Sequence, residues 1–209
     1  MTRGKHIVVE GIDAAGKTDT AVAIKERIID TDNNVALFKA PSYDGPIGLL
    51  IRDVFDKKAQ VNPMAMMHLF IADEIDQESI VVQQLGMGCH VLRDRHTLIS
   101  GPVYQTEHHS MRTVLRTFPP NLFSPIDLVV LLECDPLVAI ERRKAGRRER
   151  STGSLYQTDS VGHLLKLRDR YRHARHLHDD VVMRWMTFDT TEGQGPEDIA
   201  RAVCIELEI

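Results

Sequence analysis

The sequence lacks three features that would place the protein in a membrane, outside the cell or on nucleic acid. No apolar run approaches the length of a membrane span, and the amino terminus has no apolar signal-peptide core. The cysteines are only three, Cys89, Cys134 and Cys204, an odd number at wide spacing that does not suggest a disulfide framework. The net charge of −4 offers no general basic field for nucleic acid. We expect a cytoplasmic protein with no membrane or nucleic-acid partner.

What remains is the composition of an ordinary folded domain. The chain has 209 residues, of which 43% are apolar and 27% are charged, and this is enough to bury a sizeable core. It contains no internal repeat, no low-complexity tract and no linker. The sequence therefore predicts a single domain over residues 1–209.

The most informative stretch lies near the amino terminus. The mostly apolar residues 7–10 read as a buried strand, and residues 11–18 (GIDAAGKT) match G-x-x-x-x-G-K-[ST] without a mismatch. A helix-forming run over 21–29 follows. A strand, a glycine-containing loop and a helix N-terminus in this order indicate a phosphate-binding P-loop.

Anion capture explains why these residue types are needed. Gly11 and Gly16 allow a tight backbone path whose N–H groups point inward, toward the same place as the N-terminus of the following helix. Lys17, expected to face solvent and phosphate, adds a full positive charge, and the Thr18 hydroxyl is placed to bind Mg²⁺. The sequence therefore predicts binding of a nucleoside triphosphate.

Strands and helices alternate along the rest of the chain. The predicted strands after the first are 35–39, 90–93, 127–133 and 185–188, and the further helices are 47–55, 63–85, 101–117, 137–144, 159–181 and 196–208. Alternation of this kind predicts an α/β fold with a parallel sheet covered on both faces. Because the carboxyl ends of all its strands share one edge, Pro41-Ser42-Tyr43 and Asp94-Arg95-His96 should lie beside the P-loop.

Nothing resembles the guanine-reading N-K-x-D of GTPases, whereas several segments together resemble the thymidylate kinase family. The matching segments are 10–18 (EGIDAAGKT), 41–43 (PSY), 69–73 (LFIAD), 94–96 (DRH) with Tyr104-Gln105, 127–132 (DLVVLL) and 188–190 (FDT). The resemblance implies a P-loop kinase three-layer sandwich with a five-stranded parallel sheet and an arginine-rich lid. It also implies transfer of the γ-phosphoryl of ATP to a deoxynucleoside monophosphate, usually dTMP, with Mg²⁺, and a homodimer.

By the same resemblance, the donor site can be assigned residue by residue. Arg142 corresponds to the arginine that stacks on the adenine, and Asp94 would join Thr18 in holding Mg²⁺ or its water. Asp19 stands where a second threonine is common, which changes the surroundings of the metal. The complete ATP-binding set is Gly11, Ala14, Ala15, Gly16, Lys17, Thr18, Asp19 and Arg142.

The lid is expected over residues of about 145–158. Some family members carry an arginine in the P-loop, at the position of Ala14, whereas others supply it from the lid. This sequence has the second arrangement, so one of Arg147, Arg148 and Arg150 is expected to reach the phosphates as a catalytic group. A solvated basic loop without a role in transfer is the alternative.

The acceptor needs a cation and an aromatic surface. Arg95 can form two parallel hydrogen bonds with the acceptor's 5′-phosphate, which lysine cannot do. By resemblance, Asp13 orients the acceptor near its 3′-hydroxyl and 5′-phosphate. The other expected substrate-binding residues are Pro41, Tyr43, Phe70, Glu74, Ser100, Tyr104 and Gln105, although the spacing from Asp94 to Tyr104 is one residue longer than usual.

Glu74 bears on which base is accepted, because many family members have a thymine-contacting arginine there. Phe70 and Glu74, four residues apart, share a helix face, so Glu74 could lie at the edge of a stacked pyrimidine. There it would match the amino group of cytosine better than the carbonyl of thymine. Alternatively, Glu74 turns aside to pair with a cation. Thymidylate is the leading acceptor; kinases for dUMP, 5-modified dUMP or dCMP and a non-catalytic nucleotide-binding regulator are the alternatives.

Overall fold

The computed structural model describes residues 2–118, 120–146, 160–177 and 181–209. Five parallel strands form one sheet in the order β2-β3-β1-β4-β5. Their bounds are β1 His6–Gly11, β2 Val35–Lys39, β3 His90–Asp94, β4 Leu128–Glu133 and β5 Trp185–Asp189. All five predicted strands are confirmed, as is the α/β class with a five-stranded parallel sheet.

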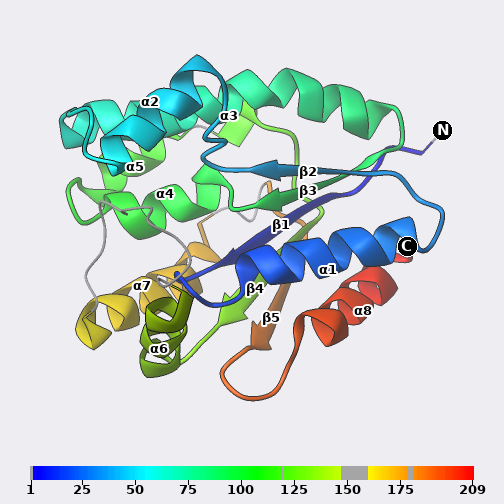
Figure 1. Cartoon of the computed structure of the whole chain (residues 1–209). Coiled ribbons are helices and arrows are strands. Elements are labelled where there is room, and N and C mark those ends of the chain that lie inside the picture. The colour runs from blue at the N-terminus through cyan, green and yellow to red at the C-terminus, as the bar shows by residue number, and fades with distance from the viewer. Residues whose placement is uncertain (1, 119, 147–159, 178–180) are drawn as a thin grey trace.

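Helices cover both faces of the sheet (Figure 1). Their bounds are α1 Lys17–Ile29, α2 Gly45–Phe55, α3 Pro63–Gly86, α4 Thr97–Gln105, α5 Met111–Thr117, α6 Pro136–Gly146, α7 Val161–Ala174 and α8 Pro196–Leu207. Helices α1 and α8 pack side by side on one face, and α4 packs against α7 on the other. None of these described helices is long and apolar enough to cross a membrane.

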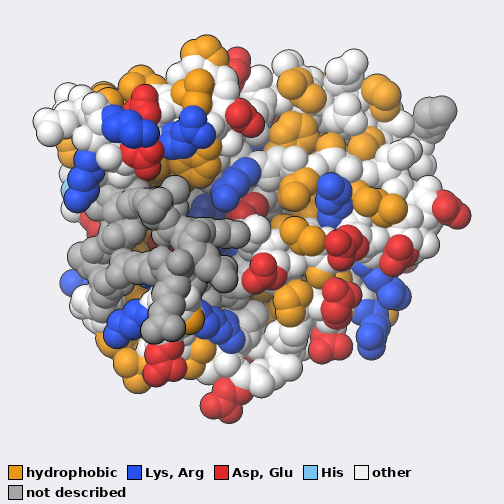
Figure 2. All heavy atoms as spheres, in the orientation of Figure 1, with side chains coloured by type: hydrophobic (Ala, Val, Ile, Leu, Met, Phe, Trp, Pro, Cys, Tyr) orange, Lys and Arg blue, Asp and Glu red, His pale blue; other side chains and the backbone are white. Residues whose placement is uncertain are grey.

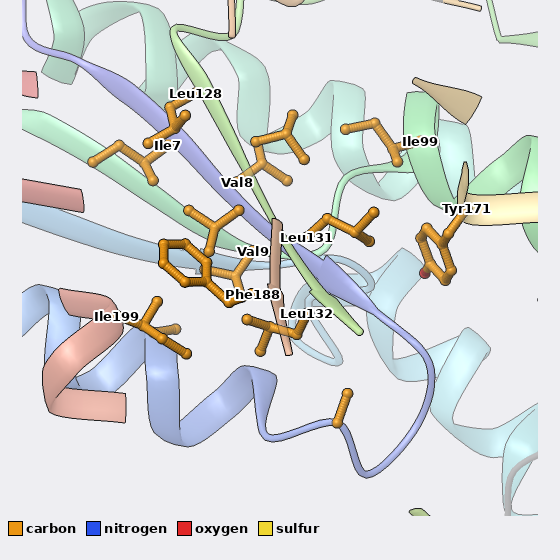
Figure 3. Close-up of a cluster of buried hydrophobic side chains, with 14 of the residues drawn as sticks. Ile7, Val8, Val9, Ile99, Leu128, Leu131, Leu132, Tyr171, Phe188 and Ile199 are labelled. Atoms are coloured by element: carbon orange, nitrogen blue, oxygen red, sulfur yellow. The ribbon is translucent and has the colours of Figure 1, made fainter. Parts of the chain in front are cut away.

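The central strands explain where the core sits. Every residue of β1 is buried, and β4 is buried except at Glu133, because a parallel sheet with helices on both faces hides both sides of its inner strands. Figure 3 shows Ile99 of α4 and Tyr171 of α7 on one side of these strands and Ile199 of α8 on the other. The edge strand β2 is only partly buried. The core thus fixes β1, whose carboxyl end carries the P-loop.

A second apolar cluster lies apart from the main core, between α2 and α3. Its buried members are Ile51, Val54 and Met66, and Tyr43, Phe55 and Phe70 are among the partly buried residues that pack against it. We call this the α2–α3 cluster.

On the surface, the face shown in Figure 2 has acidic and basic side chains interspersed over the part that is described.

Two predicted helices differ most in their bounds from the structure. The predicted helix 101–117 is two helices, α4 and α5, because the Ser110 hydroxyl accepts the Thr113 N–H at 3.2 Å and starts a new helix. Helix α4 also begins earlier, where the His96 side chain accepts the Leu98 N–H. The predicted helix 159–181 is α7, which follows Ser160 and ends at Ala174.

Candidate functional site

The P-loop connects β1 to α1, and its two glycines have backbone conformations that other residues rarely adopt. Gly11 has a φ of 147°, and a Cβ there would lie 2.5 Å from the Leu132 carbonyl oxygen. Gly16 has a φ of 93° and directly precedes α1. The first N–H groups of α1 have no partner within the helix, so this turn forms an anion-binding cradle.

The side chain of Lys17 does not have the solvent-facing position that the sequence predicted. Its side chain is only 8% exposed and folds back over the loop, where Nζ donates to the Ile12 carbonyl at 2.8 Å. The prediction that it faces solvent is therefore wrong for this structure. Burial lowers the pKa of Lys17 to about 8. A phosphate entering the cradle would offer the ammonium group a stronger acceptor than a carbonyl.

The two predicted magnesium ligands lie together. Thr18 Oγ1 donates to Asp94 Oδ2 at 2.9 Å, and this contact joins the first turn of α1 to the carboxyl end of β3. Parallel pairing of β1 with β3, in which Val9 faces Asp94, brings the two segments side by side. A hydroxyl and a carboxylate are hard oxygen donors of the kind that Mg²⁺ takes.

A cavity beside the P-loop is lined by the predicted donor residues except Gly11. Arg142 of α6 forms part of its wall, held by a hydrogen bond of 2.6 Å from Nη2 to the Thr190 carbonyl. Sequence reasoning did not assign the opposite wall, which follows β5. The cavity is lined by Ala14, Ala15, Gly16, Lys17, Thr18, Asp19, Thr20, Arg142, Thr190, Gln194, Gly195 and Pro196.

Arg95 lies at the centre of the second half of the site. It follows β3 with a φ of 76°, and its guanidinium donates to Asp13 through Nη2 and to the Tyr171 hydroxyl at 2.8 Å through Nη1. Tyr171 in turn donates to the fully buried Glu10 at 2.8 Å. The guanidinium also lies over the Tyr104 ring, 5.2 Å from its centre. Arg95 is therefore held in place before any phosphate arrives.

Asp13 is surrounded by cations. Burial raises the pKa of its carboxyl group, but the charges of Arg95, Lys17 and Arg143 outweigh this and hold the pKa below its ordinary value. Arg143 was not identified from the sequence; its Nη2 lies 3.7 Å from Asp13 Oδ2. The lid arginines Arg147, Arg148 and Arg150 lie outside the described residues.

A second cavity, bordered by Asp13 and Arg95, contains the predicted acceptor residues except Glu74. Aromatic rings form much of its wall: Tyr43 and Phe55 have ring centres 6.0 Å apart, and Phe55 and Phe70 6.1 Å apart. Phe55, Thr97, Gly101 and Phe118 were not found by sequence reasoning. The lining is Asp13, Ala40, Pro41, Tyr43, Phe55, Phe70, Arg95, Thr97, Ser100, Gly101, Tyr104, Gln105 and Phe118.

Glu74 is the exception among the predicted substrate residues. It is fully buried behind the acceptor cavity rather than on its wall, and its Oε1 accepts from Arg93 Nη1 at 2.6 Å. The arrangement in which Glu74 reads the base edge is therefore not the one in the structure; the alternative, in which it pairs with a cation, is. Burial raises the pKa of Glu74 to about 7, against the opposing charge of Arg93.

Comparisons with known proteins agree with this geometry. A sequence model of the thymidylate kinase family matches residues 9–187. The probable thymidylate kinase of Archaeoglobus fulgidus is 32% identical over 143 residues, which are 68% of this chain and 70% of that protein. The thymidylate kinase of Schizosaccharomyces pombe is 28% identical over 146 residues, 70% of this chain and 69% of that protein.

A solved structure supports the fold. The thymidylate kinase of Candida albicans superposes with a TM-score of 0.71 at 18% identity, covering 99% of this chain and 92% of that one. The P-loop, the neighbouring acceptor cavity and the family match over residues 9–187 lead to one conclusion. The chain belongs to the thymidylate kinase family and is a nucleoside monophosphate kinase.

Proposed function

We propose that the protein transfers the γ-phosphoryl group of ATP to a deoxynucleoside 5′-monophosphate, with dTMP as the leading acceptor and dTDP as the product. The observation that carries this proposal is that the P-loop forms the border between the two cavities, since Asp13 lines one and the next residue, Ala14, lines the other. Asp13 is part of the loop that forms the phosphate cradle and also lines the aromatic cavity, next to Arg95. A donor in the first cavity and an acceptor in the second would meet at this border.

The residues present fit a magnesium ion. Thr18 and Asp94 supply a hydroxyl and a carboxylate 2.9 Å apart, and the exposed Asp19 lines the cavity beside the P-loop together with Thr18. When bound, Mg²⁺ would neutralise charge on the donor phosphates. Thr18 and Asp94 would hold it on the phosphate side of the P-loop.

On the donor side, the chain's own groups bind and orient ATP. Lys17 and the N–H groups at the start of α1 bind the phosphates, and Arg142 stacks on the adenine. One of Arg147, Arg148 and Arg150 closes over the transferring group and helps to exclude water.

On the acceptor side, Arg95 binds the 5′-phosphate and Asp13 orients the sugar. Phe70 stacks on the base, and the ring of Tyr104 packs against the guanidinium of Arg95. Pro41, Tyr43, Ser100 and Gln105 complete the wall of the acceptor cavity. Phosphoryl transfer depends mainly on position and charge neutralisation, and this set of residues provides both.

The residues of the acceptor cavity constrain the identity of the base less than they constrain the 5′-phosphate. Glu74 is buried behind the cavity and does not line it. The residues that α3 and α4 contribute to the lining, among them Phe70, Thr97, Ser100 and Gln105, are therefore uncharged. This favours a pyrimidine stacked on Phe70 but gives no charged group to select thymine strictly. A kinase for dUMP, 5-modified dUMP or dCMP is the second candidate.

The test is ADP release, measured by an enzyme-coupled assay, with ATP, Mg²⁺ and each of dTMP, dUMP, 5-modified dUMP and dCMP. We expect the highest kcat/KM with dTMP. A higher value with another monophosphate would make that nucleotide the substrate. Binding of ATP without ADP release for any acceptor would instead support the non-catalytic regulator.

A further inference from the structure

Behind the acceptor cavity lies an ion cluster formed by Glu74 and Glu78 of α3 and Arg93 of β3. Arg93 and Glu74 are fully buried, and Glu78 is 8% exposed. Arg93 donates from Nη1 to Glu74 Oε1 at 2.6 Å and from Nη2 to Glu78 Oε2 at 3.0 Å. The phosphate and acceptor assignments above use none of these groups.

The two carboxylates differ in what else they bind. Glu78 Oε1 accepts the Ser124 backbone N–H at 2.7 Å, in the segment before β4. Glu74 Oε2 accepts the Thr97 backbone N–H at 2.6 Å, and its Oε1 lies 3.3 Å from His96 Nδ1. Of the two carboxylates, Glu74 is therefore the one that accepts a backbone N–H from the first turn of α4.

This connection joins the two walls of the acceptor cavity. Phe70, one turn before Glu74 on α3, forms one wall; Thr97, Ser100 and Tyr104 of α4 belong to the other. A buried carboxylate at a helix N-terminus makes a short, charge-assisted hydrogen bond and interacts favourably with the helix dipole. Arg93 compensates its charge and keeps the carboxylate from turning away.

We propose that Glu74 is a positioning residue of the acceptor site, which holds the first turn of α4 at a fixed distance from α3 and so sets the width of the cavity that receives the acceptor. This rests on the proposed function, because it takes that cavity to be the acceptor site. Glu74 acts through Thr97 and the rest of α4, without contact with the base.

Glu74→Gln and Glu78→Gln form a matched pair, since both weaken a bond to the same guanidinium from the same helix. We expect both variants to lower the melting temperature. Only Glu74→Gln should raise the KM for dTMP, by about tenfold for the loss of one charge-assisted hydrogen bond, while kcat and the KM for ATP stay within about twofold. Equal changes in the KM for dTMP in both variants, or none in Glu74→Gln, would overturn the proposal.

A second pair of variants works even if Glu74→Gln does not fold. Thr97 is the first residue of α4, where proline is tolerated, so Thr97→Pro removes the N–H that Glu74 accepts. Thr97→Ala removes the hydroxyl and the γ-methyl group, as proline also does, but keeps the backbone N–H, and is the control. Thr97→Pro should weaken acceptor binding about tenfold relative to Thr97→Ala; equal affinities would overturn the proposal.

The affinity of dTMP is best measured by calorimetry as well as by kinetics. Binding of dTMP to the wild-type protein without ADP release would count against the proposed function, yet the comparison of the variants would still test Glu74. Release of ADP with normal dTMP affinity in Glu74→Gln and Thr97→Pro would support the proposed function and reject the role of Glu74.

Discussion

The two halves of the site are built in different ways. The phosphate cradle of the donor half comes from eight consecutive residues, 11–18, and its chemistry depends chiefly on backbone N–H groups held by two glycines. The acceptor half brings side chains from the P-loop, the segment after β2, α2, α3, the segment after β3 and α4 to one cavity, and charged groups fix the position of Arg95. Continuous sequence makes the phosphate cradle, whereas tertiary packing makes the acceptor cavity.

This difference has an energetic consequence. A backbone cradle is kept in place by the sheet and the helix that flank it, so a change in one side chain should alter charge more than shape. Buried charged groups hold one another, and removal of one leaves its partners without compensation. Substitutions in the donor half should therefore affect transfer, while those in the acceptor half should affect binding and stability together.

The largest effect is expected for Lys17→Ala. The variant loses the cation that we propose binds the β- and γ-phosphates, so we expect kcat to fall by about 10³ or more, in the range found for removal of groups that stabilise the transition state. The affinity of dTMP should hardly change. Near wild-type turnover would show that the P-loop has no role in the mechanism. A loss of dTMP affinity as large as the loss of kcat would show that the donor and acceptor halves do not act separately.

The lid comes next. Single alanines at Arg147, Arg148 and Arg150 should give one variant whose kcat falls by about 10³, as for an arginine finger. Arg143→Ala, which removes a cation 3.7 Å from Asp13, should instead act mainly on the KM for the acceptor. Three small, equal effects among the lid variants would support the solvated-loop alternative.

Arg95→Lys tests the acceptor half directly. Lysine retains the charge but loses the two parallel hydrogen bonds, so the KM for dTMP should rise by about 10- to 100-fold and kcat should fall. The KM for ATP should remain nearly constant. If ATP binding weakened equally, Arg95 would belong to the donor half.

The smallest effect on turnover is expected for Tyr171→Phe. The missing hydroxyl donates to Glu10 at 2.8 Å and accepts from Arg95 at 2.8 Å, so the buried carboxylate of Glu10 loses a donor. We expect a loss of about 1–3 kcal/mol in the free energy of unfolding, measured by urea denaturation, and a modest rise in the KM for dTMP. A wild-type unfolding free energy would mean that the acceptor half does not depend on buried polar contacts.

Prediction from the sequence followed the same division. The P-loop could be recognised because its function lies in a continuous pattern, and the strands because apolar runs separate clearly from turns. Helix α4 was harder: its start depends on the His96 side chain and also on Glu74, which is 23 residues away from Thr97 and accepts its N–H. The break before α5 depends on a local hydrogen bond of Ser110, which is a signal that the sequence does contain.

The direction of a side chain was the least predictable property. Glu74 and Phe70 share a helix face by spacing, yet Phe70 lines the cavity and Glu74 turns to Arg93. The sequence contains the arginine but does not indicate that β3 carries it beneath α3. Phe118 and Arg143 were missed for a similar reason, since each reaches the site from a helix end without a motif of its own.

The α2–α3 cluster gives the molecule two levels of stability. Tyr43, Phe55 and Phe70 line the acceptor cavity and pack on this small cluster, which is separate from the core around β1 and β4. A unit with few buried apolar groups opens at a lower free energy than the whole chain unfolds. The backbone amides of the segments that carry the aromatic wall can therefore exchange their hydrogens with solvent while those of the sheet and the phosphate cradle remain protected from exchange. An acceptor that stacks on this wall would slow the exchange.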